Sequence, residues 1–372
     1  MYKQAESDSP LREVIRQFRA PVRFAFGYGS GVFKQDRREN GDKARITVTC
    51  TPFSTRQPLV DLILAVTHAN HWHSINIQQN PHHYSGLRFL GSTAVTQVQE
   101  HLGAGVYFNA YVEINGTRLK YGVVSLSTLC SDLVNWDTLY LAGRMQKPIL
   151  VLKQDAVVGI NSQVNLTNAV RLALLMLPET FTEEEFFRQI VSFSYTGDPR
   201  MRLGEHPNKI PNIVRGQYAD LQAIYRDILG NMSNVTVQTS PAALHQDLRP
   251  ETQARMLRHL PGAFFYRLTR EFQKRDPSIF TTPAVLLTPG STAATLSAKA
   301  MLPGNDFESL NAQTQASLGM AGSAELSTCL LNAVTRTVRR PALTQSLKGL
   351  LTAGLARSAR YSLAKFRRSR ML

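Results

Sequence analysis

The feature that most constrains the fold lies near the N-terminus, where an apolar run ends in closely spaced glycines. The sequence PVRFAFGYGSGVF, residues 21–33, places Gly27, Gly29 and Gly31 two residues apart. Glycine adopts left-handed backbone conformations readily, and without a side chain it lets the backbone approach a ligand or another strand closely. The segment therefore predicts a strand that enters a tight glycine turn.

A second constraint is a single acid inside an apolar run. The sequence PLVDLILAV, residues 58–66, contains only Asp61 among apolar residues, which is typical of a buried central strand. A carboxylate in such a strand costs free energy unless it is paired with a cation or bound to a metal. Asp61 is therefore a candidate Mg²⁺ ligand, and the alternative is an ion-paired core acid or a residue at the strand end.

The rest of the first half continues this mixture of strands and helices. Two β-rich arms around Asn115-Gly116, residues 105–125, predict a hairpin, whereas residues 127–147 are predicted to be helical. PILVLK, residues 148–153, predicts a last strand. From about residue 163 the pattern predicts successive helices, with Thr182 and Glu185 forming a capping box. We expect an α/β (α+β) chain.

Histidines and cysteines give weaker signals. His71 and His73 alternate as on a strand, and no third ligand stands at a familiar zinc spacing, so packing or contact with phosphate is the preferred interpretation. The three cysteines are far apart, which favours a reducing compartment. No apolar run approaches the length that a membrane span needs.

Charge is concentrated at the C-terminus. The formal net charge is +15, and no acid follows Glu325. On a helical projection of the last residues, an apolar arc faces a cationic one, which predicts a helix that lies on an anionic membrane surface. A core-docked helix or a disordered basic tail is the alternative. The candidate membrane-contacting cations are Arg357, Arg360, Lys365, Arg367 and Arg368.

The glycine turn alone leaves several functions open. Its spacing does not match the dinucleotide-binding pattern, and the Lys-Ser/Thr of a P-loop is absent. In a nucleotidyltransferase, a Gly-Ser pair after the first strand binds the phosphates of a nucleoside triphosphate, and an acid on a neighbouring strand holds Mg²⁺. Gly29-Ser30 and Asp61 fit that order. A glycine turn without any ligand fits equally well.

Longer segments resemble one family. They are FGYGSGVF, HHYSGLRFLG, GAGVYFNAYVEINGTRLKYGVVS, LVNWDTLYLAGRMQKP, LMLPETFTEEEFF and SYTGDPRM. In this order they resemble the mitochondrial phosphatidate cytidylyltransferases, the translocator assembly and maintenance proteins. The likeness runs from about residue 23 to residue 228, with a weaker echo at QSLKGLLTAGLARSARY.

The resemblance implies a fold and a domain order. A nucleotidyltransferase domain of the DNA polymerase beta superfamily, with a mixed sheet, is expected over residues 15–160. A helical, winged-helix-like domain is expected over 161–285. A flexible low-complexity segment over 286–335 and a basic amphipathic membrane-binding tail over 336–372 complete the expected order.

The resemblance also implies a reaction. CTP and phosphatidic acid would give CDP-diacylglycerol and pyrophosphate with Mg²⁺, feeding cardiolipin synthesis from the matrix side of the mitochondrial inner membrane. Nucleic acid is not an expected partner in this interpretation. Two alternatives remain: a template-independent nucleotidyltransferase acting on RNA, and a non-catalytic mitochondrial assembly factor.

Candidate site residues follow from these motifs. Ser30, with the backbones of Gly29 and Gly31, would hold the triphosphate, and Asp61 would hold Mg²⁺. The superfamily commonly pairs acids two residues apart, but Ile63 occupies that position, so Glu113, Asp198 or Asp220 would supply the second carboxylate. The remaining candidates contact phosphate, ribose or base: Lys120, Tyr121, Lys147, Asp198 and Arg200. A plain interdomain salt-bridge loop is the alternative for Asp198 and Arg200.

Overall fold

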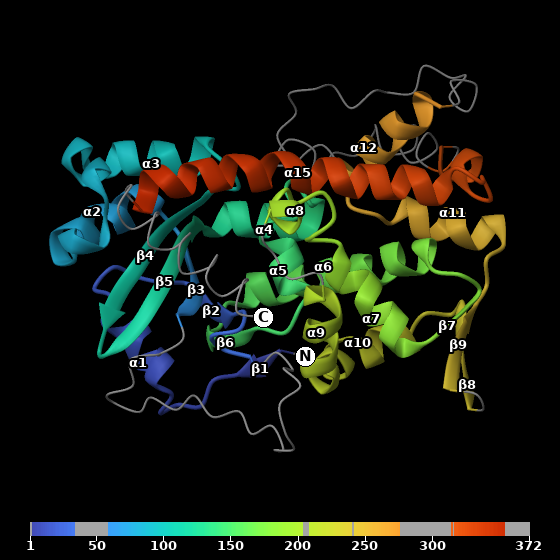
Figure 1. Ribbon diagram of the computed structural model, residues 1–372, viewed down its shortest axis with the longest axis horizontal. Coiled ribbons are helices and arrows are strands. Elements are labelled where there is room, and N and C mark those ends of the chain that lie inside the picture. The colour runs from blue at the N-terminus through green and yellow to red at the C-terminus, as the bar shows by residue number, and fades with distance from the viewer. Residues whose placement is uncertain are drawn as a thin grey trace.

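A mixed six-stranded sheet and two groups of helices make up the computed structural model (Figure 1). The structure describes residues 2–33, 59–203, 208–239, 242–275, 314 and 316–353. The five candidate membrane-contacting cations between residues 357 and 368 lie outside these ranges. Among the described residues, no helix combines the length and apolar character that crossing a bilayer requires.

The sheet has the strand order β1-β6-β2-β3-β5-β4. Its strands are β1 (Lys3–Gln4), β2 (Phe24–Tyr28), β3 (Val60–Val66), β4 (Val106–Ile114), β5 (Thr117–Ser125) and β6 (Leu150–Lys153). The β3–β5 and β1–β6 pairs are parallel and the others are antiparallel. The predicted strands around residues 24–28, 60–66 and 150–153 and the hairpin at Asn115-Gly116 are confirmed.

Alternating residues of the central strands bury both faces of the sheet. Leu62 and Leu64 pack with α1 (Pro10–Arg16) and α2 (Ala69–Gln79) on one face. Ile63 and Ala65 point to the other face, into a core shared with α4 (Leu126–Asn135), α5 (Ala142–Met145) and α6 (Ala156–Met176). The first face is also covered by η1 (Pro81–His83), η2 (Gly86–Leu90) and α3 (Gly91–His101). Helix α3 packs on β4.

The helices that follow α6 are α7 (Glu183–Ser192), α8 (Arg200–Leu203), α9 (Lys209–Gly216), α10 (Tyr218–Gly230), α11 (Pro250–Arg258), α12 (Gly262–Gln273) and α15 (Leu326–Ala353). Of these, α7, α10 and α11 pack against α6, α9 packs against α7 and α10, and α12 packs against α4 and α15. A small sheet of order β7-β9-β8 joins them, from β7 (Thr180–Phe181), β8 (Val235–Thr239) and β9 (Ala242–Gln246). The capping box of Thr182 and Glu185 begins α7 as predicted. The expected boundary at residues 160/161 falls inside α6, whose side chains belong to one core that serves both groups of helices.

The long helix α15 (Leu326–Ala353) crosses the molecule from α12 to α3 (Figure 1). The expected boundary at residues 335/336 falls inside it. Its Lys348 is buried, and the ammonium donates to the carbonyls of Gln99 (2.8 Å) and Leu102 (2.7 Å) at the end of α3. The part of the expected tail before residue 354 is therefore packed against the sheet domain.

Two local predictions are wrong. His71 and His73 lie on helix α2 and not on a strand. His73 is buried, its ring nitrogens lie 2.9 Å from the Tyr84 hydroxyl and 2.8 Å from Gln99 Oε1, and burial lowers its pKa to about 4. The predicted helix over residues 127–147 is broken, because Trp136 and Leu139 adopt left-handed conformations with φ of 54° and 53°.

A buried carboxylate holds this break in place. Asp132, at the end of α4, accepts hydrogen bonds from the backbone N–H groups of Thr138, Leu139, Leu141 and Ala142, at 2.7 to 3.0 Å. It also accepts from the Thr138 hydroxyl at 2.9 Å. The carboxylate therefore supplies the acceptors that the broken helix lacks and fixes the start of α5.

We predict that Asp132→Ala lowers the free energy of unfolding by about 3 kcal/mol, because several buried N–H groups lose their acceptor. Urea unfolding followed by circular dichroism measures this change. Asp8→Asn is the control, since Asp8 is exposed and accepts a hydrogen bond from the adjacent Ser7 hydroxyl. Equal stability of the two variants would contradict this account of the turn.

Candidate active site

The glycine turn packs directly on the beginning of β3. Tyr28, the last residue of β2, pairs with Asp61, and Gly29 follows with a left-handed φ of 77°. The Gly29 carbonyl accepts from the N–H groups of Val32 (3.1 Å) and Phe33 (2.9 Å), which closes the turn. A side chain at Gly31 would meet the carbonyl oxygen of Leu59 at 2.3 Å. Only glycine allows this close approach.

The turn brings Ser30 and Asp61 to the same edge of the sheet. Ser30 is exposed at the tip of the turn, and the position of a side chain on Gly29 would lie 3.7 Å from Asp61 Oδ2. Asp61 is not enclosed in the core, since its side chain is 27% exposed. It sits at the start of the strand, where its carboxylate can face a ligand.

Lys120 on the neighbouring parallel strand completes this edge. It pairs with Asp61 in the β3–β5 register, and its ammonium lies 3.5 Å from Asp61 Oδ1. The same ammonium stacks over the ring of Phe108 at 4.4 Å from the centroid. Asp61 therefore forms an ion pair near the end of its strand, as the alternative interpretation expected.

Arg144 lies beside this edge between two tyrosines. Its guanidinium carbon is 3.8 Å from the ring centroid of Tyr140 and 5.1 Å from that of Tyr28, and Nη1 donates to the Tyr140 carbonyl at 2.6 Å. Burial raises the pKa of Tyr28, and the nearby Asp61 carboxylate raises it further, against the opposing effects of Arg144 and Lys120. The phenol of Tyr28 is therefore a protonated donor at neutral pH.

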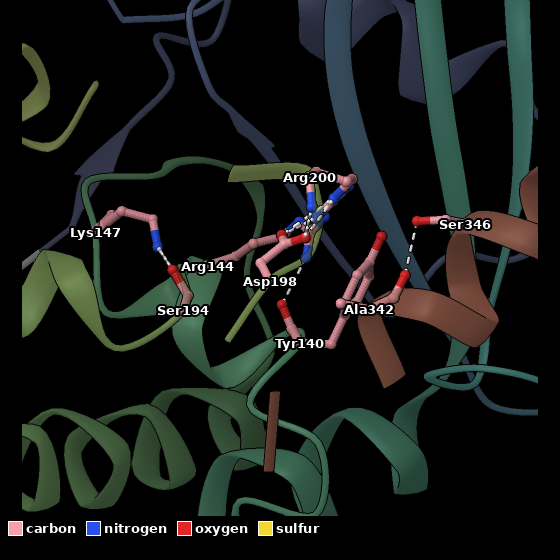
Figure 2. A network of polar contacts seen from close by, with 8 residues as sticks. All are labelled: Tyr140, Arg144, Lys147, Ser194, Asp198, Arg200, Ala342 and Ser346. Carbon is pink, nitrogen blue, oxygen red and sulfur yellow. Dashed lines mark hydrogen bonds and ion pairs between the residues drawn. The ribbon is translucent and has the colours of Figure 1, made fainter. Parts of the chain in front are cut away.

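The loop before α8 brings a second guanidinium to Arg144. Asp198 is buried and holds Arg200 in a bidentate ion pair, with Nε–Oδ1 of 3.0 Å and Nη2–Oδ2 of 2.6 Å. Figure 2 shows the Asp198–Arg200 ion pair and the contact of Arg144 with Tyr140, and Arg144 is close enough to Arg200 to oppose the rise of its pKa. Burial alone would raise the pKa of Asp198, but its hydrogen bonds and ion pair with Arg200 outweigh burial and lower it. Asp198 is therefore engaged by Arg200.

Two lysines extend this cationic group. The Lys147 ammonium donates to the Gly143 carbonyl and to the Ser194 hydroxyl, the latter at 2.7 Å (Figure 2). Tyr195 lies between the lysines, with ammonium–centroid distances of 5.2 Å for Lys147 and 4.8 Å for Lys209. Burial, together with Arg144 and Lys209, lowers the pKa of Lys147 well below its ordinary value.

We call Arg144, Lys147, Arg200 and Lys209 the cation cluster. Asp198 forms an ion pair with Arg200, and the four cations of the cluster lie close together in a partly desolvated place. Such an arrangement is costly without a counter-charge and attracts a polyanion. The glycine turn, Asp61 and Lys120 stand beside it, linked through Tyr28 and Arg144.

Comparison with known proteins identifies the family to which the chain is similar. Residues 11–368 match the family described as mitochondrial phosphatidate cytidylyltransferase. The mitochondrial phosphatidate cytidylyltransferase of Xenopus laevis is 35% identical over 357 residues, covering 95% of this chain and 93% of that protein. That of Saccharomyces cerevisiae is 44% identical over 228 residues, covering 60% and 56%. That of Schizosaccharomyces pombe is 33% identical over 383 residues, covering 98% and 84%.

The chain belongs to the mitochondrial phosphatidate cytidylyltransferase family. The motifs that first indicated this family supply the site. FGYGSGVF contains the glycine turn and Tyr28, LVNWDTLYLAGRMQKP contains Tyr140 and Arg144, and SYTGDPRM contains Tyr195 and Arg200. Tyr28, Tyr140 and Tyr195 are not among the candidate residues that the sequence predicts. Their presence in these motifs, next to glycines and cations, was the signal that could have found them.

In this family member, three predicted residues do not join the site. Tyr121 is buried on the opposite face of the sheet, where its hydroxyl bonds with Asn76 and His83. Glu113 is exposed on β4, where it pairs with Arg118 of β5. Because β5 lies between β4 and β3, the strand of Glu113 is about 10 Å from the strand of Asp61. Asp220 forms an ion pair with Lys3 at 2.6 Å. The structure therefore does not bring a second carboxylate from Glu113 or Asp220 to Asp61.

We predict that Gly31→Ala lowers cytidylyl transfer about a hundredfold, because the added methyl group must push the turn away from Leu59 and misplace Ser30. Turnover at saturating lipid measures this effect. Gly159→Ala in α6 is the matched control, since a side chain there meets nothing within 4 Å. If Gly31→Ala kept the activity of Gly159→Ala, the turn would have no part in the reaction.

Proposed function

We propose that this chain is the enzyme that converts CTP and phosphatidate into CDP-diacylglycerol and pyrophosphate. The observation that carries the proposal is the meeting of the glycine turn, Asp61 and the cation cluster in a member of this family. The glycine turn after β2 and the acid on β3 support a nucleotidyltransferase domain of the DNA polymerase beta superfamily. The helices α7 to α12 with the β7-β9-β8 sheet support a winged-helix-like second domain.

The reaction needs relief of negative charge more than a strong base. A phosphate oxygen of phosphatidate forms a bond to the α-phosphorus of CTP, and the bond from that phosphorus to the α–β bridging oxygen breaks. Both electrons leave with pyrophosphate. A phosphate monoester is largely dianionic near neutral pH, so the nucleophile is already ionised. The protein must then bring two anions together and stabilise the charge on the leaving group.

The residues present fit a Mg²⁺ ion that arrives with the nucleotide. Among the described residues, no group of three His, Cys, Asp or Glu side chains could hold a metal on its own. Mg²⁺ is commonly bound through one or two carboxylates together with substrate phosphates, and Asp61 beside the glycine turn offers one such carboxylate. Bound there, Mg²⁺ would neutralise phosphate charge and polarise the α-phosphate.

The chain's own residues divide the remaining work. The N–H groups of the turn and the Ser30 hydroxyl would orient the triphosphate. The Lys120 ammonium would contact both the Asp61 carboxylate and a phosphate. The cation cluster would receive the β- and γ-phosphates, which become pyrophosphate. Since Asp198 holds Arg200 and Tyr140 stacks on Arg144, the cluster is held in place before the nucleotide binds.

The family name and the basic C-terminus support a location at the membrane. We place the enzyme peripherally on the matrix side of the mitochondrial inner membrane, where its product would feed cardiolipin synthesis. The candidate membrane-contacting cations follow α15, which ends at Ala353 in the described chain. Their contact with anionic lipid would keep the enzyme near a substrate that does not leave the bilayer easily.

Asp61→Asn tests the proposed reaction. Purified protein is incubated with labelled CTP, Mg²⁺ and phosphatidate vesicles, and we expect label in the lipid phase, reduced about a hundredfold or more in the variant. Asp8→Asn is the control for the change of an exposed acid. Label on added RNA instead of lipid would favour the template-independent alternative, and no turnover by the wild type would favour an assembly factor.

The depressed pKa of Lys147 predicts a pH dependence of CTP binding. Burial disfavours the charged ammonium in the free protein, so the charge is lost as pH rises through a pKa below the ordinary lysine value. CTP affinity should fall as pH rises through this lowered pKa, at a lower pH than an ordinary lysine would give. Lys147→Arg should move this fall to higher pH, whereas Lys274→Arg, at a lysine outside the cluster, should leave it unchanged. Isothermal titration calorimetry measures both.

The structure also fixes where the tail can be removed. Gln345, Lys348 and Thr352 are buried, so a cut should come after Ala353. We predict that this truncation weakens binding to vesicles containing phosphatidate about tenfold or more, since six cations are removed, each contributing about 1 kcal/mol at an anionic surface. CTP binding should not change. Undiminished co-sedimentation with these vesicles would contradict a membrane role of the tail.

A further inference from the structure

An exposed apolar pair on η2 has no place in the site described above. Phe89 and Leu90 are adjacent, and their side chains are 78% and 69% exposed, with Phe89 the most exposed large apolar side chain in the described chain. Two neighbouring side chains of this size in water lose the free energy that burial would give. Such exposure commonly marks a contact surface.

Hydrogen bonds before the pair and a left-handed glycine after it fix the position of Phe89 and Leu90. Ser85 begins η2 and its hydroxyl accepts from the Leu87 N–H at 3.4 Å. Arg88 donates to the Pro81 carbonyl and stacks over the Phe89 ring at 4.8 Å from the centroid. The left-handed Gly91, with φ of 82°, then begins α3. The two apolar side chains are therefore presented outward from a fixed turn with a cation beside them.

The same turn lies at the end of the sheet that carries Asp61. Helix α2 begins after β3 ends, at the end of the strand opposite Asp61, and runs back along the sheet. Asn76, near the end of α2, donates to the Tyr121 hydroxyl at 3.0 Å. His83 in η1 also lies 2.9 Å from that hydroxyl. Tyr121 follows Lys120 in β5, and Lys120 pairs with Asp61. Residues 81–90 therefore connect α2 to α3 at the site's end of the sheet.

Helix α15 points toward this turn. Gln345 bonds with the Ala104 N–H and the Val106 carbonyl, whereas Lys348, further along α15, bonds with Gln99 and Leu102. The two helices are therefore antiparallel, and the end of α15 is directed to the beginning of α3 (Figure 1). Leu343 and Leu347, four residues apart, are exposed on α15.

The positive charge near the apolar pair indicates what this surface contacts. The sequence after Ala353 contains no acid and six cations: Arg357, Arg360, Lys365, Arg367, Arg368 and Arg370. They follow a helix that ends in the direction of η2, and Arg88 adds a cation next to the apolar pair. Apolar side chains flanked by cations suit the interface of an anionic bilayer, where the chains enter the acyl boundary and the cations meet headgroup phosphates.

We propose that Phe89 and Leu90 are a membrane-inserting contact that docks the site's end of the sheet on a bilayer containing phosphatidate, in addition to the basic tail. The inference rests on the proposed function for the identity of the lipid. It means that the protein meets the membrane at two points of its fold, which sets the orientation of the site toward the lipid headgroups.

The double variant Phe89→Ser/Leu90→Ser tests this proposal in the full chain. We expect about tenfold weaker co-sedimentation with phosphatidylcholine vesicles containing phosphatidate, because two apolar side chains no longer enter the bilayer. CTP binding should be unchanged. Val157→Ser/Ile160→Ser on α6 is the matched control, since these aliphatic side chains are 51% and 69% exposed. Equal loss in both variants, or no loss in the first, would overturn the proposal.

A spectroscopic variant keeps the test independent of turnover. The chain has two tryptophans, Trp72 and Trp136, and both are buried, so the added indole of Phe89→Trp reports on its own surroundings. We expect a blue shift on adding phosphatidate vesicles and quenching by lipids with brominated acyl chains. An unshifted spectrum would overturn the proposal. So would a protein that self-associates without lipid, if the double variant abolishes that self-association. Turnover of dispersed short-chain phosphatidate reports separately on the proposed function.

Discussion

The carboxylate of Asp132 is the interaction on which the site depends. It lies near the end of α4 and accepts hydrogen bonds from four N–H groups of the segment that leads into α5. A four-residue helix has little stability of its own in water, so the position of α5 comes from this carboxylate and from packing. Arg144 belongs to α5 and Lys147 follows it closely. Half of the cation cluster is thus positioned by an acid that does not touch it.

The cation cluster shows how stability and function oppose each other here. Lys147 is half-buried, and Arg144 and Lys209 are near enough to lower its pKa. Bringing these positive charges together costs folding free energy, and the ammonium of Lys147 donates to Ser194 and Gly143. In the proposed reaction, a bound triphosphate would add negative charge beside them. Tyr28, Tyr140 and Tyr195 supply aromatic faces, which hold cations without neutralising them.

The sequence predicted the elements whose signals are local. Glycine spacing predicted the turn after β2, Asn115-Gly116 predicted the hairpin, and Thr182 with Glu185 predicted the start of α7. Helix α2 was missed because His73 and Asn76 face its buried side, so the apolar period is absent. The break after α4 was missed because it depends on Asp132 accepting from residues further along the chain, which no local pattern reveals.

The candidate site followed the same division. The motifs predicted Ser30, Asp61, Lys120 and Lys147 as candidates, and the structure places Asp61 and Lys120 beside the glycine turn. The side of the sheet on which Tyr121 points depends on the strand register, and its burial under α2 was not visible in the sequence. The second carboxylate was sought on a strand that β5 separates from Asp61. Asp198 and Arg200 were both candidates, and they form an ion pair with each other inside one loop, two residues apart.

Helix α15 has a mechanical consequence. It packs on α12 and α6 near one end and on β4 and α3 near the other, so one helix joins the helical part to the sheet. A change of the angle between the two parts would have to bend α15 or break the buried bonds of Gln345 and Lys348. Pro341, which removes one hydrogen bond inside the helix, lies between these two sets of contacts and is where such bending would meet least resistance.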